Sequence, residues 1–257
     1  MKRVKRIMVL VAMAAFIVSP SLVFASGQIG VYVTPKFVYG DVRGDNMKRT
    51  FWGYEDGYLD GYGKNNYGVK GDHVYGGALA VGYDLQKRLG VPVRVELEYA
   101  MFSDAKLKRS YQWNYISNSG HNQYELSLGI QTMFANVYYD FRNTSAFTPY
   151  AGLGLGMSLI SAKGKYQWAD EYGPGSYSVG KKTNTNFAWN LSAGVAYAFT
   201  DMISLDLGYR LVAPGKGKTK KSITYDKRPS NDYFETEQWK SENLYIHQFL
   251  AGVRFTF

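Results

Sequence analysis

The stretch FAWNLSAGVAYAF, residues 187–199, decides the fold of this chain. Successive side chains point to opposite faces of a β-strand. One face of this stretch carries Phe187, Trp189, Leu191, Ala193, Val195, Tyr197 and Phe199. The other face carries only alanine, asparagine, serine and glycine, whereas a sheet surface in water is expected to carry Lys, Glu and Thr. Small residues fit the crowded interior of an eight-stranded barrel, and the apolar face then contacts lipid.

The stretch VRVELEY, residues 93–99, is interpreted in the same way. Valine and leucine occupy one of its faces, and Arg94, Glu96 and Glu98 occupy the other. In a soluble sandwich the charged face would meet water. In a membrane barrel it faces the lumen, where the tiny side chains of other strands leave room for it. We therefore expect these three charges inside the barrel.

Eight segments alternate in this manner: 28–40, 73–83, 92–102, 125–142, 149–160, 186–199, 203–212 and 243–257. Each is long enough for a tilted membrane strand of roughly 9–11 residues. The long connections 41–72, 103–124, 161–185 and 213–242 alternate with the short connections 84–91, 143–148 and 200–202. The sequence therefore predicts an all-β fold, an eight-stranded antiparallel transmembrane β-barrel with four long outer loops and three short periplasmic turns.

The segment 125–142 is the least regular of the eight. Its apolar residues lie in one phase up to Ile130 and in the other phase from Val137 onward. A β-bulge adds one residue to a strand and shifts this phase. We therefore predict a bulge between Gln131 and Phe134, with a helix as the alternative.

The first 25 residues are predicted to be a signal peptide. Four basic residues precede an apolar run at 7–18, which is too short to span a bilayer as a mature helix. The small-residue site before Ala25 places the cut between Ala25 and Ser26, with a retained anchor as the alternative. Removing the basic leader reduces the formal charge from +9 to +5. The mature domain is then residues 26–257, and its lack of cysteine excludes disulfide and thiol chemistry.

Aromatic residues cluster at the ends of the segments, as in the interfacial girdles of barrels. With a periplasmic N-terminus, the outer girdle is predicted to contain Tyr39, Tyr99, Trp189, Tyr209 and Tyr245. The inner girdle is predicted to contain Tyr83, Tyr139, Phe141, Tyr197 and Phe199. The chain ends inside a strand at Phe257, which in a barrel pairs with the first strand and leaves no open edge.

Charges that face the lumen must find partners, because an unpaired charge in a narrow lumen costs several kcal/mol. The predicted lumen network consists of Lys36, Arg94, Glu96, Glu98, Asp206, Arg210 and Arg254. Counting from the periplasmic strand ends pairs Arg94 with Asp206, Glu96 with Arg254, and Glu98 with Arg210. Lys36 is expected higher, near the outer mouth. Such a network would close the barrel to solutes.

The segments FANVYYDF, TPYAGLGLGMSL, GVAYAFTDMISLDLGYRL and FLAGVRFTF resemble the small outer-membrane barrel family, which includes opacity proteins, related surface antigens and the barrel domain of outer membrane protein A. The resemblance covers about residues 27–257. It implies an outer-membrane location in a Gram-negative bacterium and a role as adhesin, immune-evasion antigen or envelope component. It also implies that Val253, Phe255 and Phe257 form the signal read by the barrel-assembly machinery. No peptidoglycan-binding domain follows the barrel, which puts envelope tethering through such a domain in doubt.

Some eight-stranded barrels act on lipid A, and that chemistry requires particular side chains. A deacylase needs a serine activated by a histidine, and His73, His121 and His247 lack a His-x-Ser arrangement. A palmitoyltransferase needs an acyl-sized lumen, which a charged lumen would not provide. No metal-ligand spacing and no cofactor motif is visible, so the sequence predicts a non-enzymatic protein without cofactors.

Two outer connections are candidate recognition segments. The basic run PGKGKTKK holds Lys216, Lys218, Lys220 and Lys221, which could bind lipopolysaccharide phosphates or a host polyanion. The stretch FWGYEDGYLDGYGKNNYG, residues 51–68, is dense in tyrosine and glycine, as recognition surfaces are. Ordinary solvated or self-packed loops are the alternatives.

We expect a monomeric surface protein in contact with lipid and lipopolysaccharide, with no nucleic-acid partner. A narrow pore or an entry channel for small hydrophobic solutes is the second hypothesis.

Overall fold

The computed structural model describes residues 30–55, 58–114, 119–171, 173–225 and 234–257. The predicted signal peptide, with its cleavage site at Ala25 and Ser26, lies outside the described residues. The described strands are β1 (Val31–Glu55), β2 (Tyr58–Gly68), β3 (Asp72–Asp84), β4 (Val93–Phe102), β5 (Ala105–Asn114), β6 (Ser119–Asp140), β7 (Phe147–Asp170), β8 (Gly173–Ala198), β9 (Ile203–Gly215), β10 (Ser222–Tyr225) and β11 (Phe234–Thr256). A short helix, α2 (Gln86–Leu89), lies in the turn between β3 and β4.

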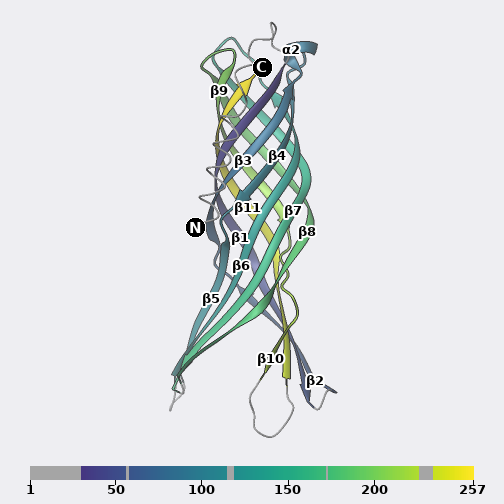
Figure 1. The fold of residues 1–257 in the computed structure, drawn as a ribbon. Coiled ribbons are helices and arrows are strands. Elements are labelled where there is room, and N and C mark those ends of the chain that lie inside the picture. Colours follow the sequence, from purple (N-terminus) through teal and green to yellow (C-terminus); the bar gives the residue numbers. More distant parts are fainter. Residues whose placement is uncertain (1–29, 56–57, 115–118, 172, 226–233) are drawn as a thin grey trace.

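Eight antiparallel strands form a closed ring, as predicted. Neighbours follow the order β11, β9, β8, β7, β6, β4, β3, β1, and β1 pairs with β11 from Tyr32↔Thr256 onward to close the barrel. The beginning of β1 and the end of β11 meet at this seam, where the Gly30 N–H donates to the Phe257 carbonyl and the Phe257 N–H donates to the Val31 carbonyl. The helix α2 and the short turns gather at one end of the barrel (Figure 1).

The long outer connections lie where they were predicted, but they are mostly β-structure rather than irregular loops. The strand β1 continues to Glu55, β7 continues to Asp170, and β11 begins at Phe234. At the outer end the sheet divides into two prongs (Figure 1). The first prong is formed by β5 and the outer parts of β6, β7 and β8. The second prong is formed by β2, the outer parts of β1 and β11, and β10.

The interior of the outer part is apolar, and this explains the altered phase of segment 125–142. Leu126, Leu128 and Ile130 point inward and are buried, whereas Val137 and Tyr139 point outward and are exposed. The ladders of β6 with β4 and β7 run through 131–134 without a register shift. The predicted bulge was therefore wrong. The sequence pattern changes because the apolar face moves from the lipid side to the inside where the barrel leaves the membrane.

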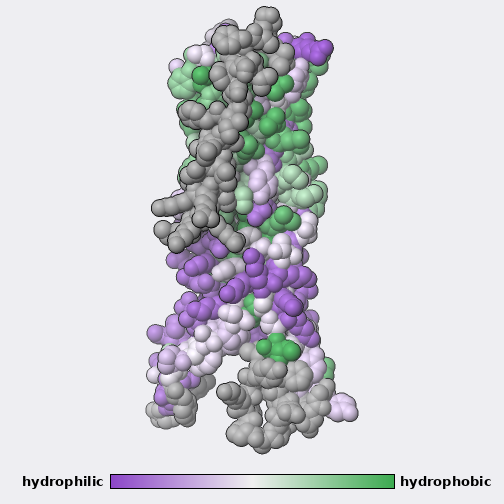
Figure 2. Space-filling view, viewed as in Figure 1, coloured by the Kyte–Doolittle hydropathy of each residue, from purple (hydrophilic) through white to green (hydrophobic). Residues whose placement is uncertain are grey.

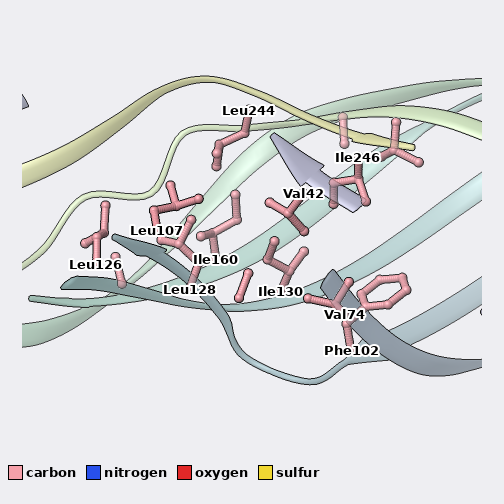
Figure 3. Close-up of a cluster of buried hydrophobic side chains, with 14 of the residues drawn as sticks. Val42, Val74, Phe102, Leu107, Leu126, Leu128, Ile130, Ile160, Leu244 and Ile246 are labelled. Atoms are coloured by element: carbon pink, nitrogen blue, oxygen red, sulfur yellow. The ribbon is translucent and has the colours of Figure 1, made fainter. Parts of the chain in front are cut away.

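A cluster of buried apolar side chains fills this outer interior (Figure 3). It includes Val42, Leu107, Leu128, Ile160 and Leu244, each fully or nearly fully buried. On the outside, an apolar belt covers the end with the turns, and a hydrophilic band follows it toward the prongs (Figure 2). The protein is thus a membrane barrel continued by a folded outer section with an apolar interior.

Two irregularities shape the outer section. Asn243 has a φ of 45°, and its side-chain amide donates to Asp45 over 3.0 Å. At this point the set of alternate residues of β1 and β11 that faces inward changes. A register shift between β7 and β8 lies at Ala162/Gly164. Bulges of this kind re-aim side chains, and here they turn Trp239 into the interior.

Candidate functional site

Charged side chains fill the lumen within the apolar belt. Lys36 of β1 lies between two carboxylates of β4, with its Nζ 2.6 Å from Glu96 Oε1 and 2.7 Å from Glu98 Oε2. Arg210 of β9 reaches across the barrel and places its Nη1 2.5 Å from Glu98 Oε1. This is the pairing that strand depth predicted. The Glu98 side chain is fully buried and binds two cations at once.

A second group of ion pairs lies nearer the turns. Arg94 was predicted to pair with Asp206, which is wrong: its Nε is 2.9 Å from Asp140 Oδ2. Arg142 also reaches Asp140, at 3.3 Å, and Asp84, at 2.7 Å. Sequence reasoning missed Asp84, Asp140 and Arg142. Each aspartate follows a tyrosine at the end of a strand, in GYD and YYD, and this shared hairpin pattern was the available signal.

The remaining predicted pairing was also wrong. Arg254 places its Nη2 3.1 Å from Asp206 Oδ1, and not beside Glu96, which Lys36 occupies instead. The shear of a closed barrel shifts the depth of one strand relative to another. Counting residues from the strand ends therefore predicted which residues face inward, but not which of them meet.

Aromatic rings separate the charged groups of the lumen. The Arg94 guanidinium lies 5.0 Å from the ring centre of Tyr138, 5.1 Å from that of Tyr150 and 5.9 Å from that of Tyr32. A cavity of about 20 Å³ remains between these groups and Lys36. That volume suits about one water molecule, so we infer that this part of the lumen holds no continuous water path.

The outer section closes the barrel a second time. Lys36 was expected near the outer mouth, but the apolar cluster lies beyond it along β1. Farther out, Tyr124 stacks on Tyr67 with ring centres 4.7 Å apart and contacts Trp239 at 5.7 Å. These contacts join the bases of the two prongs. Tyr177 of the first prong also donates to Glu237 of the second over 2.5 Å, and Arg49 pairs with the same carboxylate.

The predicted girdle residues lie on the outward face of the ring strands. At the turn end, Tyr139 contacts Phe141 at 5.1 Å and Tyr197 contacts Phe199 at 5.0 Å. At the outer edge of the belt, a hydrogen bond of 3.0 Å joins the Tyr39 hydroxyl to His73 Nδ1. Sequence reasoning omitted several members: Tyr75, Phe147, Phe187 and Phe249.

The two candidate recognition segments meet on the second prong. Lys221 lies 4.1 Å above the ring of Trp52 and 5.7 Å from that of Tyr54. Trp52 contacts Tyr62 of β2 with ring centres 6.0 Å apart, and Lys64 lies 5.3 Å from the Tyr62 ring. These five residues, the aromatic–basic face, come from connections that are distant in the sequence. Cation–π contact holds the lysines over the rings.

The other lysines of the basic run occupy different positions. Lys216 and Lys220 are exposed, and Lys218 forms an isolated bridge with Lys240 of β11. Between them Gly217 is buried and its N–H donates to Ser241 over 2.8 Å. The run is therefore packed against β11 rather than held as a free solvated loop.

The three histidines occupy separate surface positions. His73 contacts Tyr39 and lies 3.6 Å from Asp41, His247 contacts Tyr209 over 2.7 Å, and His121 lines a surface hollow with Trp168. Among the residues that the structure describes, no hydrogen bond joins a histidine to a serine. The described part of the chain also contains no group of three potential metal-binding side chains and no helix long and apolar enough to cross a membrane.

A closed barrel with a lipid-facing belt, aromatic girdles and a salt-bridged lumen defines the class of integral outer-membrane β-barrel proteins. The family model described as outer membrane protein beta-barrel domain matches residues 8–257, and this chain belongs to that family. The protein is accordingly located in the cell outer membrane.

Similar proteins occur in several bacteria. Outer membrane protein PagN of Salmonella typhimurium is 29% identical over 219 residues, which cover 81% of this chain and 89% of that protein. A Rickettsia bellii protein named "putative adhesin" is 24% identical, covering 73% of this chain and 77% of that protein. The solved structure of Neisserial surface protein A is 20% identical, covers 90% of this chain and 100% of that chain, and aligns with a TM-score of 0.45.

Proposed function

We propose that this outer-membrane surface protein is a non-enzymatic adhesin, and that the aromatic–basic face of the second prong contacts the ligand. The observation that carries this proposal is the contact of Lys221 with Trp52, because it brings both candidate recognition segments together on the second prong. The names of the Rickettsia relatives support an adhesive role. The long prongs hold this face away from the lipid.

The chemistry of the face favours an acidic carbohydrate. Aromatic rings offer a flat apolar surface, and the lysine ammonium groups attract carboxylate or sulfate groups. Lys48 and Lys240 extend the positive surface along β1 and β11, and both bind the single carboxylate of Glu242, at 2.7 and 3.5 Å. We infer a ligand that combines sugar rings with negative charges.

The test measures binding of intact bacteria to immobilised acidic polysaccharide, with neutral dextran as the control surface. We expect the combined change Trp52→Ala, Lys64→Gln and Lys221→Gln to reduce binding at least about tenfold, since each lost contact contributes roughly 0.5–1 kcal/mol. Binding should also weaken with salt, because exposed charges are screened. The matched control is Lys87→Gln with Arg88→Gln, in the turn α2 at the opposite end. Equal binding by the triple variant and the wild type would refute the proposal.

The pore hypothesis predicts a different electrical behaviour. The ion pairs of Lys36, Glu98 and Arg210, together with the apolar cluster beyond them, block the lumen. We expect the refolded protein to show no steady conductance in a planar bilayer, while Arg210→Ala with Glu98→Ala raises the frequency of brief openings. Steady conductance of the wild type would replace this interpretation with a narrow porin.

We infer export by the leader 1–25 and recognition of the last strand by the assembly machinery. In support, Val253 and Phe255 lie on the outward face of β11, and Phe257 closes the seam with β1.

A further inference from the structure

A second basic surface lies on the outward face of the first prong. Lys106, Ser127 and Lys163 form one cross-strand row on β5, β6 and β7. Lys108, Glu125 and Lys165 form the next row outward. The four lysine side chains are all exposed, and among the residues that the structure describes only Lys108 has a carboxylate partner, Glu125 at 3.6 Å. We call these four residues the lysine array.

Neighbouring strands add positive charge to the array. Lys70 pairs with Lys108 across an isolated bridge. The bulge of β8 opposite Gly164 places Lys181 and Lys182 beside β7, and both are exposed.

Acidic side chains at the array are fewer. Glu125 accepts a hydrogen bond from Ser127 over 3.2 Å. Asp72 accepts the backbone N–H of Lys106 over 2.9 Å, and Asp104 lies against Gly129. In the described part of the chain, lysines at this surface therefore outnumber the carboxylates beside them, and the surface keeps an excess of positive charge.

The position of the array relative to the lipid belt identifies its partner. Below it lies one row of hydroxyl groups, where Ser161 contacts Thr183 over 2.8 Å, and the apolar belt ends with Leu159. Lys163 is four residues beyond Leu159, about 13 Å along the strand at 3.3 Å per residue. A strand tilt of about 40° reduces the height above the belt to about 10 Å. The flexible lysine stem can lower its charge further toward the headgroups.

We propose that the lysine array binds the phosphate groups of lipopolysaccharide in the outer leaflet. Lysine is a compact point charge that suits phosphate, and basic side chains beside a membrane are attracted to anionic headgroups. A soluble acidic ligand would not require a site at the lipid boundary. The array therefore anchors one side of the barrel to the surrounding lipid, and this role is independent of the proposed adhesion.

The test compares lipopolysaccharide binding of variants reconstituted in nanodiscs of uncharged lipid. The array variant carries Lys106→Gln, Lys108→Gln, Lys163→Gln and Lys165→Gln. We expect its affinity for purified lipopolysaccharide to fall at least about tenfold, since each lysine near an anionic surface contributes several-fold. The control variant removes the same charge from the second prong, with Lys48→Gln, Lys64→Gln, Lys221→Gln and Lys240→Gln, and should retain affinity.

Two further measurements make the result decisive. Glu125→Gln removes the carboxylate within the array and leaves every lysine in place, so lipopolysaccharide affinity should rise roughly threefold. Dephosphorylated lipopolysaccharide should bind the wild type as weakly as intact lipopolysaccharide binds the array variant. Equal affinity for both lipopolysaccharides, equal losses in the array and control variants, or loss of only soluble polysaccharide binding in the array variant would overturn the proposal. A Glu125→Gln variant without tighter binding would also contradict it, even where the array variant fails to fold.

Discussion

Replacement of Glu98 by alanine should destabilise the refolded barrel by about 3–5 kcal/mol, because it leaves a buried cation without its partner. Glu98 is fully buried and binds both Lys36, at 2.7 Å, and Arg210, at 2.5 Å. Lys36 keeps Glu96, whereas the described contacts left to Arg210 are neutral: Gln248, 2.8 Å from its Nε, and the Phe134 ring at 5.8 Å. The expected loss of stability therefore comes mainly from Arg210, whose buried charge no longer has a carboxylate partner.

The measurement is the free energy of unfolding in urea, with the protein folded into lipid vesicles. Arg210→Ala should cost less than Glu98→Ala, because the carboxylate it leaves behind still binds Lys36. The double variant should be more stable than the sum of the single losses predicts, as expected for residues in direct contact.

The matched control is an exposed ion pair of the outer section. Lys48 and Glu242 are 2.7 Å apart, but their side chains are 39% and 21% exposed. Solvent screens surface pairs of this kind, so they contribute little to stability, and Glu242→Ala should be nearly neutral. If Glu98→Ala were equally harmless, the lumen would be wet and the closed barrel would be refuted.

The sequence predicted the ring strands and their inward-facing residues because one physical rule governs that part of the chain. Within the membrane the outside must be apolar, so the alternation in residues 187–199 shows directly which face contacts lipid and which faces the lumen. The same alternation placed Arg94, Glu96 and Glu98 inside, where the structure has them buried. The partners could not be predicted, because barrel shear decides which strand positions share a depth.

The outer section could not be predicted for a related reason. Above the belt the outward face is polar, and the inward face carries apolar residues such as Leu128 and aromatic residues such as Tyr124. Glycine-rich stretches indicate turns when no lipid-facing pattern accompanies them. Here such stretches lie within strands, as in β2, where Gly63 lies beneath the ring of Phe51. Long-range contacts between connections, such as Lys221 with Trp52, leave no trace in a local pattern.

Replacement of Trp239 by alanine should unfold the outer section while the membrane barrel stays intact. The Trp239 side chain is fully buried, and its Nε1 donates to Glu237 over 2.9 Å. Its ring contacts Tyr124 of the opposite prong and lies against Gly164, where a Cβ would be 2.7 Å from the ring. Burial and the Glu237 carboxylate raise the pKa of the nearby Tyr177, so its hydroxyl remains a donor to that carboxylate.

Deleting a buried tryptophan costs about 3–5 kcal/mol through lost burial and the cavity it leaves. Because Trp239 contacts Tyr124 and Glu237 of the two prongs, far along the strands from the lumen ion pairs, the loss should act locally. Limited proteolysis should then cut the variant within 105–114 and 160–185, where the wild type resists cleavage, and unheated gels should still show the compact barrel. The control is Trp52→Ala, since Trp52 lies on the aromatic–basic face outside this core. Equal protease resistance of the Trp239 variant and the wild type would show that the prongs do not depend on this core.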